Sequence, residues 1–360
     1  MNYEKLNILK NREGKRLKRL RKRKRWKKGQ NVLKYTRTQP KSIRVNRNPY
    51  TSKVENISIV AEASFTLFDQ PESCIKLIRR LDKVKKINTR GYIIVEIDLS
   101  GVVWIDQGAI SFLLAKINEL KQFRGKRIKI WGNSPKHKGA QHIFNESGFL
   151  DYMKDMFGKK FRGSIKSHIF KVGSDKMLNR NVGKAIEKSL KYITGSEQRY
   201  GPLYSIINEM CLNSVEWANE PNSLNQNWFL SVNQIEVKGE RILNFTLSDV
   251  GYGIINTLYR NFAKHISDAL EDKPEEVLAR AFDRKYGSKT KERNRNRGLP
   301  LIKKTSDKGF VKNLLVITNN VTLDFNSKEK SKKIDISLPG TFYNWDVDLN
   351  CIELWKNQRL

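Results

Sequence analysis

In residues 242–253, ILNFTLSDVGYG, an apolar strand pattern leads directly into an aspartate and two glycines. Glycine has no Cβ, so the backbone at Gly251 and Gly253 can approach a ligand that a side chain would exclude. Asp249 stands at the end of the strand, where its carboxylate can accept a hydrogen bond from an exocyclic amine such as that of adenine. Because a DxGxG sequence alone is also a common turn, the segments around it must decide its meaning.

A helical pattern over 202–219 carries a second group of polar residues. Glu209 and Asn213 are four residues apart, so both side chains project from one face of the predicted helix. An amide oxygen is a ligand suited to Mg²⁺, and a carboxylate one turn away can orient or deprotonate a water that attacks a phosphate. The alternative for this pair is a solvated helix face.

A third segment, 296–303, puts Gly298 at the predicted start of a helix over 298–305. Free amides and the helix dipole favour phosphate at such a position. The preceding stretch, 287–297, is polar, basic and poorly periodic, which suits a mobile lid over a triphosphate. A charged surface loop is the alternative interpretation of this stretch.

Together, and in this order, the three segments resemble the GHKL family, which includes gyrase, the mismatch-repair ATPase MutL, histidine kinases and anti-sigma-factor kinases. Residues 209–214 look like the ELxxNA helix of that family, and 249–253 look like its DxGxG box. Residues 297–301 are similar to its second glycine box, and 338–342 to its late Gly-Thr strand.

The resemblance implies a site for ATP and Mg²⁺. It implies magnesium at Asn213, adenine recognition by Asp249 with Thr341, and a general base at Glu209. The nucleotide-binding residues that it implies are Asn213, Asp249, Gly251, Gly253, Lys289, Arg297, Gly298, Leu299 and Thr341.

Two residues depart from the family pattern. Pro300 replaces a glycine of the second box and has no N–H to offer a phosphate, so we expect hydrolysis to be slow. Trp217 stands where many anti-sigma-factor kinases have histidine, which weakens that particular assignment.

For the second half of the chain, 174–346, the pattern predicts an α/β sandwich: a mixed sheet with helices on one face. The predicted helices lie at 174–193, 202–219, 254–283 and 298–305. The predicted strands lie at 227–236, 241–248, 313–318, 321–326, 333–338 and 341–346.

The first half also has an α/β pattern. Strands are predicted at 57–61, 65–68, 92–99, 102–105 and 126–131, with an amphipathic helix at 71–87. The nearly continuous apolar run at 92–99 is typical of a central strand buried on both faces. Asp106 is a favourable N-cap residue for a helix that runs to about Phe123.

Over residues 57–156 this half resembles the STAS fold of anti-sigma-factor antagonists, on the segment 95–106 and the helix and strand that follow. In those antagonists a serine after this strand accepts a phosphate from a GHKL kinase. Here that position is Gly108, so Ser111 or Ser100 would have to substitute. We therefore interpret this half as a protein-binding or regulatory module.

The net charge of +33 is concentrated in the first 50 residues, which hold 19 lysines and arginines but only two acidic residues, Glu4 and Glu13. The densest stretch, 15–28, cannot form a packed unit alone, because its few apolar residues do not offset the repulsion. Such a stretch attracts polyanions, and nucleic acid is the favoured partner. Ribosomal or chaperone RNA, an anionic membrane surface, an acidic protein or a purely solubilising role remain as alternatives.

The remaining features set the broader expectations. Three scattered cysteines and four scattered histidines predict no structural metal and suit a reducing cytoplasm. No apolar run is long enough for a secretory signal or a membrane span.

The predicted organisation is a basic arm at 1–52, a STAS-like domain at 57–156, a linker at 157–173, a GHKL domain at 174–346 and a tail at 347–360. The leading hypothesis is an ATP-binding, slowly ATP-hydrolysing regulatory protein. Its nucleotide state would control binding to nucleic acid, to a protein at the STAS-like domain, or to a second copy in a homodimer. The alternatives are an anti-sigma-type protein serine/threonine kinase and a nucleic-acid-binding adaptor that uses ATP only structurally.

Overall fold

The computed structural model describes residues 54–89, 91–153, 167–172, 180–217, 228–266, 273–283 and 298–358. The predicted arm at 1–52, the candidate lid at 287–297 and most of the predicted linker lie outside these ranges. Residues 53–360 form one compact unit, which combines parallel and antiparallel sheets with helices. The α/β class predicted from the sequence is therefore confirmed.

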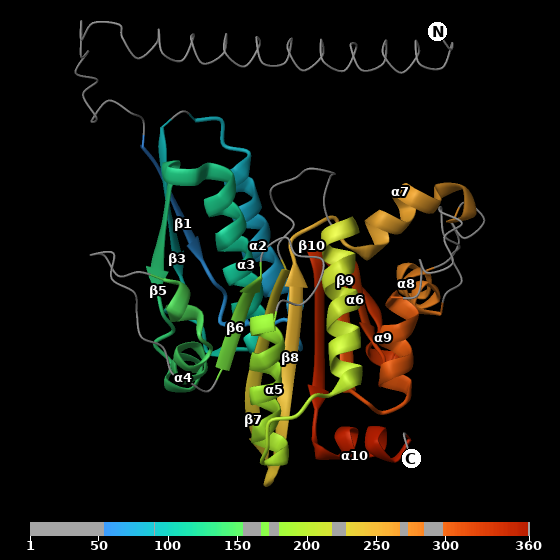
Figure 1. Ribbon diagram of the computed structural model, residues 1–360. Helices are drawn as coiled ribbons and strands as arrows, with labels where there is room; N and C mark the ends of the chain where they lie inside the picture. Colours follow the sequence, from blue (N-terminus) through green and yellow to red (C-terminus); the bar gives the residue numbers. More distant parts are fainter. Residues whose placement is uncertain are drawn as a thin grey trace, which may run out of the picture. The chain divides into compact units, whose positions relative to one another are not determined.

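The first half of the unit is built on a three-stranded parallel sheet with the order β1-β3-β5 (Figure 1). Its elements are β1 Val54–Val60, β2 Ser64–Phe65, α2 Pro71–Lys85, β3 Tyr92–Asp98, β4 Trp104–Ile105, α3 Gln107–Arg124, η2 Gly125–Arg127, β5 Ile128–Asn133, α4 Lys138–Glu146 and η3 Phe149–Tyr152. The short strands β2 and β4 pair in parallel apart from this sheet.

Asp106 is the N-cap of α3, as predicted. Its carboxylate accepts from the backbone amides of Ala109, Leu67 and Phe68, at 2.7, 2.6 and 3.0 Å. One side chain thus starts the helix and also fixes the loop that leads from β2 to α2. Burial raises the pKa of Asp106 to about 6, in spite of these three donors.

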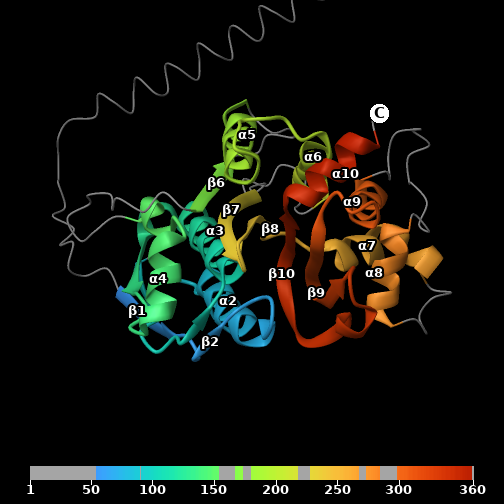
Figure 2. The same ribbon diagram turned by 90° about the horizontal axis from the view of Figure 1, so that it is seen from below.

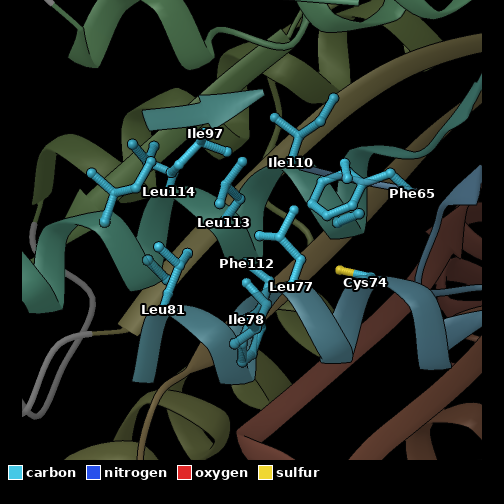
Figure 3. Packing of buried hydrophobic residues seen from close by; sticks show 14 of the residues in the cluster. Phe65, Cys74, Leu77, Ile78, Leu81, Ile97, Ile110, Phe112, Leu113 and Leu114 are labelled. Carbon is cyan, nitrogen blue, oxygen red and sulfur yellow. The ribbon is translucent and has the colours of Figure 1, made fainter. Parts of the chain in front are cut away.

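The core of the first half lies where α2 and α3 pack together. Figure 3 shows Leu77, Ile78 and Leu81 of α2 facing Phe112 and Leu113 of α3, and all five are almost fully buried. The apolar spacing at 71–87 predicted this buried face of α2. The same pattern left lysines and arginines on the opposite face of the helix, where they are exposed.

The second half is built on a five-stranded sheet with the order β6-β7-β8-β10-β9. Its elements are β6 Ser167–Val172, α5 Arg180–Thr194, α6 Gly201–Trp217, β7 Trp228–Val237, β8 Glu240–Asp249, α7 Ile254–Ile266, α8 Pro274–Phe282, α9 Gly298–Asp307, β9 Lys312–Asp324, η5 Lys328–Lys330, β10 Lys332–Val347 and α10 Leu349–Asn357. Each neighbouring pair of strands is antiparallel, so the mixed sheet predicted for this half was wrong.

Two long strands replace the four short ones predicted after residue 312. The predicted breaks are irregularities within β9 and β10, where the pairing register shifts between Leu338 and Thr341. Asn319 has a φ of 52° and Gly340 a φ of 116°, so both lie in the left-handed region that interrupts a regular strand. A bulge absorbs such residues without ending the strand.

Three further predictions are corrected. Residues 167–172, assigned to the linker, form β6, an edge strand that pairs only with β7. The predicted helix at 254–283 is two helices, α7 and α8. The predicted tail includes α10, whose N-cap Asp348 accepts from the amide of Cys351 at 2.9 Å.

Each face of the five-stranded sheet packs against a different set of helices (Figures 1 and 2). Trp228, Phe245 and Trp345 point into a core formed with α5, α6, α8 and α9. Phe229 and Phe342 point to the opposite face, where they join the core of α2 and α3. Helices of the first half thus cover the face that the sequence analysis left open.

Candidate functional site

Helix α6 supplies three neighbouring polar residues to the predicted site. Glu209 and Asn213 lie one helical turn apart, and Ser214 follows. The Ser214 hydroxyl is buried and lies 3.2 Å from Oδ2 of Asp249. Because Ser214 is next to Asn213, this contact brings the motif on α6 and the aspartate at the end of β8 into one site.

Asp249 is held in place from three sides. Its Oδ1 accepts from the amide of Gly251 at 2.9 Å, and its Oδ2 from Ser214. Thr341, its register partner on β10, donates from both its backbone amide and its hydroxyl. The side chain is 4% exposed, and burial raises its pKa to about 6 against the effect of these donors.

Two glycines let the backbone close around this aspartate. At Gly340, with a φ of 116°, a Cβ would lie 2.0 Å from the Asp249 carbonyl oxygen. At Gly253, with a φ of 80°, a Cβ would lie 2.5 Å from Oδ1 of Asn319. Both positions therefore need glycine, and Gly253 has the conformational role that the DxGxG pattern predicted.

Thr318 and Asn319 on β9 support the loop after Asp249, and the sequence analysis did not identify them. The Thr318 hydroxyl accepts from the amide of Ile254 at 2.8 Å, and the Asn319 amide group donates to the Tyr252 carbonyl at 2.8 Å. Asn319 also accepts from the amide of Asn256 at 3.2 Å. The signal in the sequence was a pair of polar residues inside an apolar strand.

These contacts occupy two of the free amides at the start of α7. The amides of Ile254 and Asn256 are engaged by β9, so they are not available to an anion. Within the described part of the chain, the start of α9 lies beside Glu209 and Asn213 of α6. Phosphate groups would therefore be met at α9 rather than at α7.

Gly298, the first residue of α9, lies directly beside the polar pair on α6. A Cβ at Gly298 would be 2.7 Å from Oε2 of Glu209 and 3.4 Å from Nδ2 of Asn213. Nδ2 of Asn213 is buried and has no hydrogen-bond partner among the residues that the structure describes. Burial raises the pKa of Glu209, and the negative charge of Glu216 raises it further.

The structure thus brings Glu209, Asn213, Asp249, Gly298 and Thr341 together from four separate segments of the chain. Gly251 and Gly253 complete the loop after β8, and Leu299 is half-buried behind Gly298 against the core. Pro300 lies in the first turn of α9, where its ring fits and its missing N–H removes one free amide. Lys289 and Arg297 lie outside the described residues.

These residues fit a magnesium–nucleotide complex. The donor set contains hard oxygen ligands at Glu209 and Asn213, which suit Mg²⁺. The unpartnered Nδ2 of Asn213 is a donor, which suits a phosphate oxygen rather than the metal, and both it and Oδ1, the atom suited to Mg²⁺, lie beside the backbone at Gly298. Asp249 supplies a buried hydrogen-bond acceptor beside Ser214 of α6.

Of the two serines considered as substitute phosphate acceptors, Ser111 is inaccessible and Ser100 is half-buried. A Cβ at Gly108 would lie 2.6 Å from Cζ of Phe342, so this position faces the sheet. Ser111, the first substitute considered, is fully buried. Ser100 is half-buried and its amide donates to Asp98 at 2.9 Å. Ser111 as an accessible acceptor is therefore wrong.

No family model and no curated protein matches this sequence. Among the described residues, no helix is both long and apolar enough to cross a membrane.

Proposed function

We propose that this chain binds ATP with Mg²⁺ at the site formed by α6, the end of β8, the start of α9 and β10, as its GHKL-like motifs imply. The single observation that supports this most strongly is the contact of α6 with both other motifs. Ser214 contacts Asp249, while Glu209 and Asn213 lie beside Gly298. These residues come from four segments that are far apart in the sequence, and polar groups that converge in this way support one shared ligand site.

Asp249 is the proposed adenine-recognising residue. The donors of Gly251, Ser214 and Thr341 together fill the roughly four acceptor positions of the carboxylate, so the exocyclic amine of adenine would take the place of one of the two hydroxyl donors. Guanine presents an oxygen in place of that amine and would be repelled by the carboxylate. The site is therefore expected to prefer ATP over GTP.

Asn213 is the proposed magnesium ligand, and the first turn of α9 the proposed phosphate contact. Bound Mg²⁺ would neutralise charge on the phosphate oxygens and polarise the terminal phosphate. Gly298 allows the α9 backbone to approach Glu209 and Asn213 closely enough for one ligand to contact both elements.

Glu209 is the proposed general base for slow hydrolysis. Its carboxylate would orient a water and take its proton as the water attacks the terminal phosphate. Its raised pKa brings it closer to the working pH, which makes it a better proton acceptor than an ordinary surface glutamate.

Strand β10 supports a regulatory role for the nucleotide. Thr341 contacts Asp249 on one face of the sheet, and the next residue, Phe342, contacts Gly108 and Phe68 of the first half on the other. A shift of β10 on nucleotide binding would change the packing of α3. Through this change in α3, nucleotide binding would alter how the STAS-like half binds a protein partner. It would also alter how the basic arm at 15–28 binds nucleic acid in the cytoplasm.

The test is calorimetric titration of the full chain with ATP in the presence and absence of Mg²⁺. We expect binding that requires Mg²⁺, that weakens at least tenfold in Asn213→Ala and Asp249→Ala, and that is unchanged in the control Asp98→Asn. Asp98 is an aspartate at the end of β3, remote from this site. Absence of binding by the wild type would refute the proposal.

The same preparation separates the alternatives. An adaptor that uses ATP structurally would bind ATP but lose no activity in Glu209→Gln. A protein kinase would transfer the terminal phosphate of labelled ATP to a protein and release little free phosphate.

A further inference from the structure

The C-terminal ends of α2 and α3 and the first residues of the three parallel strands meet at one edge of the first half. Val54 of β1 pairs with Tyr92 of β3, and Ile93 pairs with Ile128 of β5. Arg124, at the end of α3, donates to the carbonyls of Val84 and Lys85 at the end of α2, at 2.9 Å each. At this edge the strands are thus joined to one another, and α3 is joined to α2, by hydrogen bonds.

This edge, here called the basic edge, is strongly cationic. It comprises the exposed side chains of Lys83, Lys86, Lys121, Lys126, Arg127 and Lys129. The nearby acidic residues Asp82 and Glu119 form ion pairs with the buried Lys116 and with Lys85, and Glu55 is half-buried. The local excess of positive charge is therefore directed to the solvent.

Two large aromatic side chains are exposed at the same edge. Phe123 is 56% exposed and Tyr92 is 46% exposed. Lys85 and Arg124 flank the Phe123 ring, with their charged groups 6.0 and 5.6 Å from its centroid. Such rings are costly to leave in water, and exposed rings among cations are typical of surfaces on which unpaired bases stack.

We infer that the basic edge binds single-stranded nucleic acid: the lysines and Arg127 contact phosphates, and Phe123 and Tyr92 stack on bases. A duplex would offer phosphates but keep its bases inside, so it would leave both rings in water. An anionic membrane would match the charge, but it would not require flat rings held at a sheet edge. The inference extends the proposed nucleic-acid contact of residues 15–28 to the folded part of the chain, and it is independent of the ATP site.

The charge contribution is tested on the full chain without nucleotide, by fluorescence anisotropy with a labelled 20-nucleotide polyuridine probe. The triple variant Lys126→Gln, Arg127→Gln, Lys129→Gln removes three cations from the basic edge. Its matched control is Lys184→Gln, Lys188→Gln, Lys191→Gln, which removes three exposed cations from α5. We expect the first variant to bind the probe at least tenfold more weakly. The slope of its log affinity against log salt concentration should fall by an amount that corresponds to about two phosphate contacts. The affinity of the control should change less than twofold.

The aromatic contribution is tested with Phe123→Ala against Trp104→Ala. Trp104 is 69% exposed but lies on β4, after the C-terminal end of β3, away from the basic edge. Phe123→Ala is expected to weaken binding about fivefold or more and to abolish photocrosslinking of a thiouridine probe to the 121–129 peptide, with Trp104→Ala unchanged. Thermal unfolding confirms that each variant is folded.

The outcomes separate the two nucleic-acid proposals. Binding that is lost on substitution of the five residues 21–25 by glutamine, but unchanged in both basic-edge variants, overturns the basic edge and leaves the arm. The single-strand inference is also overturned if the wild type binds a duplex of the same length as tightly as the single strand. It is likewise overturned if the triple variant loses affinity for phosphatidylserine vesicles but keeps its affinity for polyuridine.

Discussion

Phe342 on β10 lies against Gly108 at the start of α3, so closely that a Cβ at residue 108 would come within 2.6 Å of its ring. Phe68 also packs against this ring, with centroids 6.0 Å apart, and the same Cβ would lie 3.0 Å from Phe68. The first half of the chain is thus joined to the five-stranded sheet at a position where no side chain fits. Gln107 adds a buried hydrogen bond to Ser231 of β7 at 2.9 Å.

Gly108→Ala is expected to lower the free energy of unfolding by about 1–3 kcal/mol, because the new methyl group must displace the Phe342 ring in a packed core. The control is Gly101→Ala, where a Cβ meets nothing within 4 Å. Urea unfolding of both variants measures the difference. Equal stability of the two variants would show that the Gly108–Phe342 contact is not tight in solution.

Glu209→Gln is expected to keep ATP affinity within about threefold and to lower the rate of hydrolysis at least a hundredfold, because glutamine cannot take a proton from water. Phosphate release measured under single-turnover conditions tests this. The control Glu353→Gln changes an exposed glutamate on α10, outside the proposed site, and should leave the rate unchanged. If Glu209→Gln hydrolysed ATP at the wild-type rate, another group would have to be the base.

Gly298→Ala is expected to weaken ATP binding about tenfold or more while changing the free energy of unfolding by less than about 1 kcal/mol. The added Cβ meets the ends of two side chains, Oε2 of Glu209 at 2.7 Å and Nδ2 of Asn213 at 3.4 Å, so the fold can adjust by moving them while the site cannot. Gly183→Ala on α5 is the control, since its Cβ would make an ordinary contact of 3.4 Å with Tyr204. Unchanged ATP affinity in Gly298→Ala would argue against a phosphate contact at the start of α9.

The buried Asp249 makes stability depend on pH. Burial raises its pKa from 3.8 to about 6, so between these values the unfolded chain releases the proton first and stability falls as the pH rises. Asp249→Asn removes this titration. We expect the wild type to lose up to about 3 kcal/mol relative to the variant between pH 4 and pH 7.

Urea unfolding at several pH values measures this difference. The control Asp98→Asn should differ from the wild type by a nearly constant amount over this pH range, because the hydrogen bonds from Ser100 lower the pKa of Asp98 below its ordinary 3.8 and its titration lies at more acidic pH. A constant difference between the wild type and Asp249→Asn across this pH range would mean that Asp249 is not desolvated in solution. The wild type should also bind ATP more weakly as the pH falls through about 6, where the acceptor carboxylate becomes protonated.

Much of the local structure could be predicted from the sequence, because it depends on short-range chemistry. Apolar spacing predicted α2 and α6, the continuous apolar run predicted β3, and Asp106 was correctly identified as the N-cap of α3. The spacing of Glu209 and Asn213 placed both on one helix face. The positions of Gly251 and Gly253 predicted a tight loop after β8, and Gly253 has the positive φ expected.

Only the tertiary structure decided how these elements meet. The pairing of β9 with β10 shows that Asn319 and Gly340 interrupt the hydrogen-bonded ladder without ending either strand. Residue propensities over a few positions cannot distinguish such an interruption from the end of a strand. The tertiary structure also brought Thr318 and Asn319 to the loop after Asp249. Their side chains accept hydrogen bonds from the amides of Ile254 and Asn256, which are 64 and 63 positions away in the sequence. The burial of Ser111 and the contact of Gly108 with Phe342 likewise depend on which face of the sheet α3 covers. Local sequence determines which residues form a helix or a strand, whereas the partner of each face is selected by packing among all the elements at once.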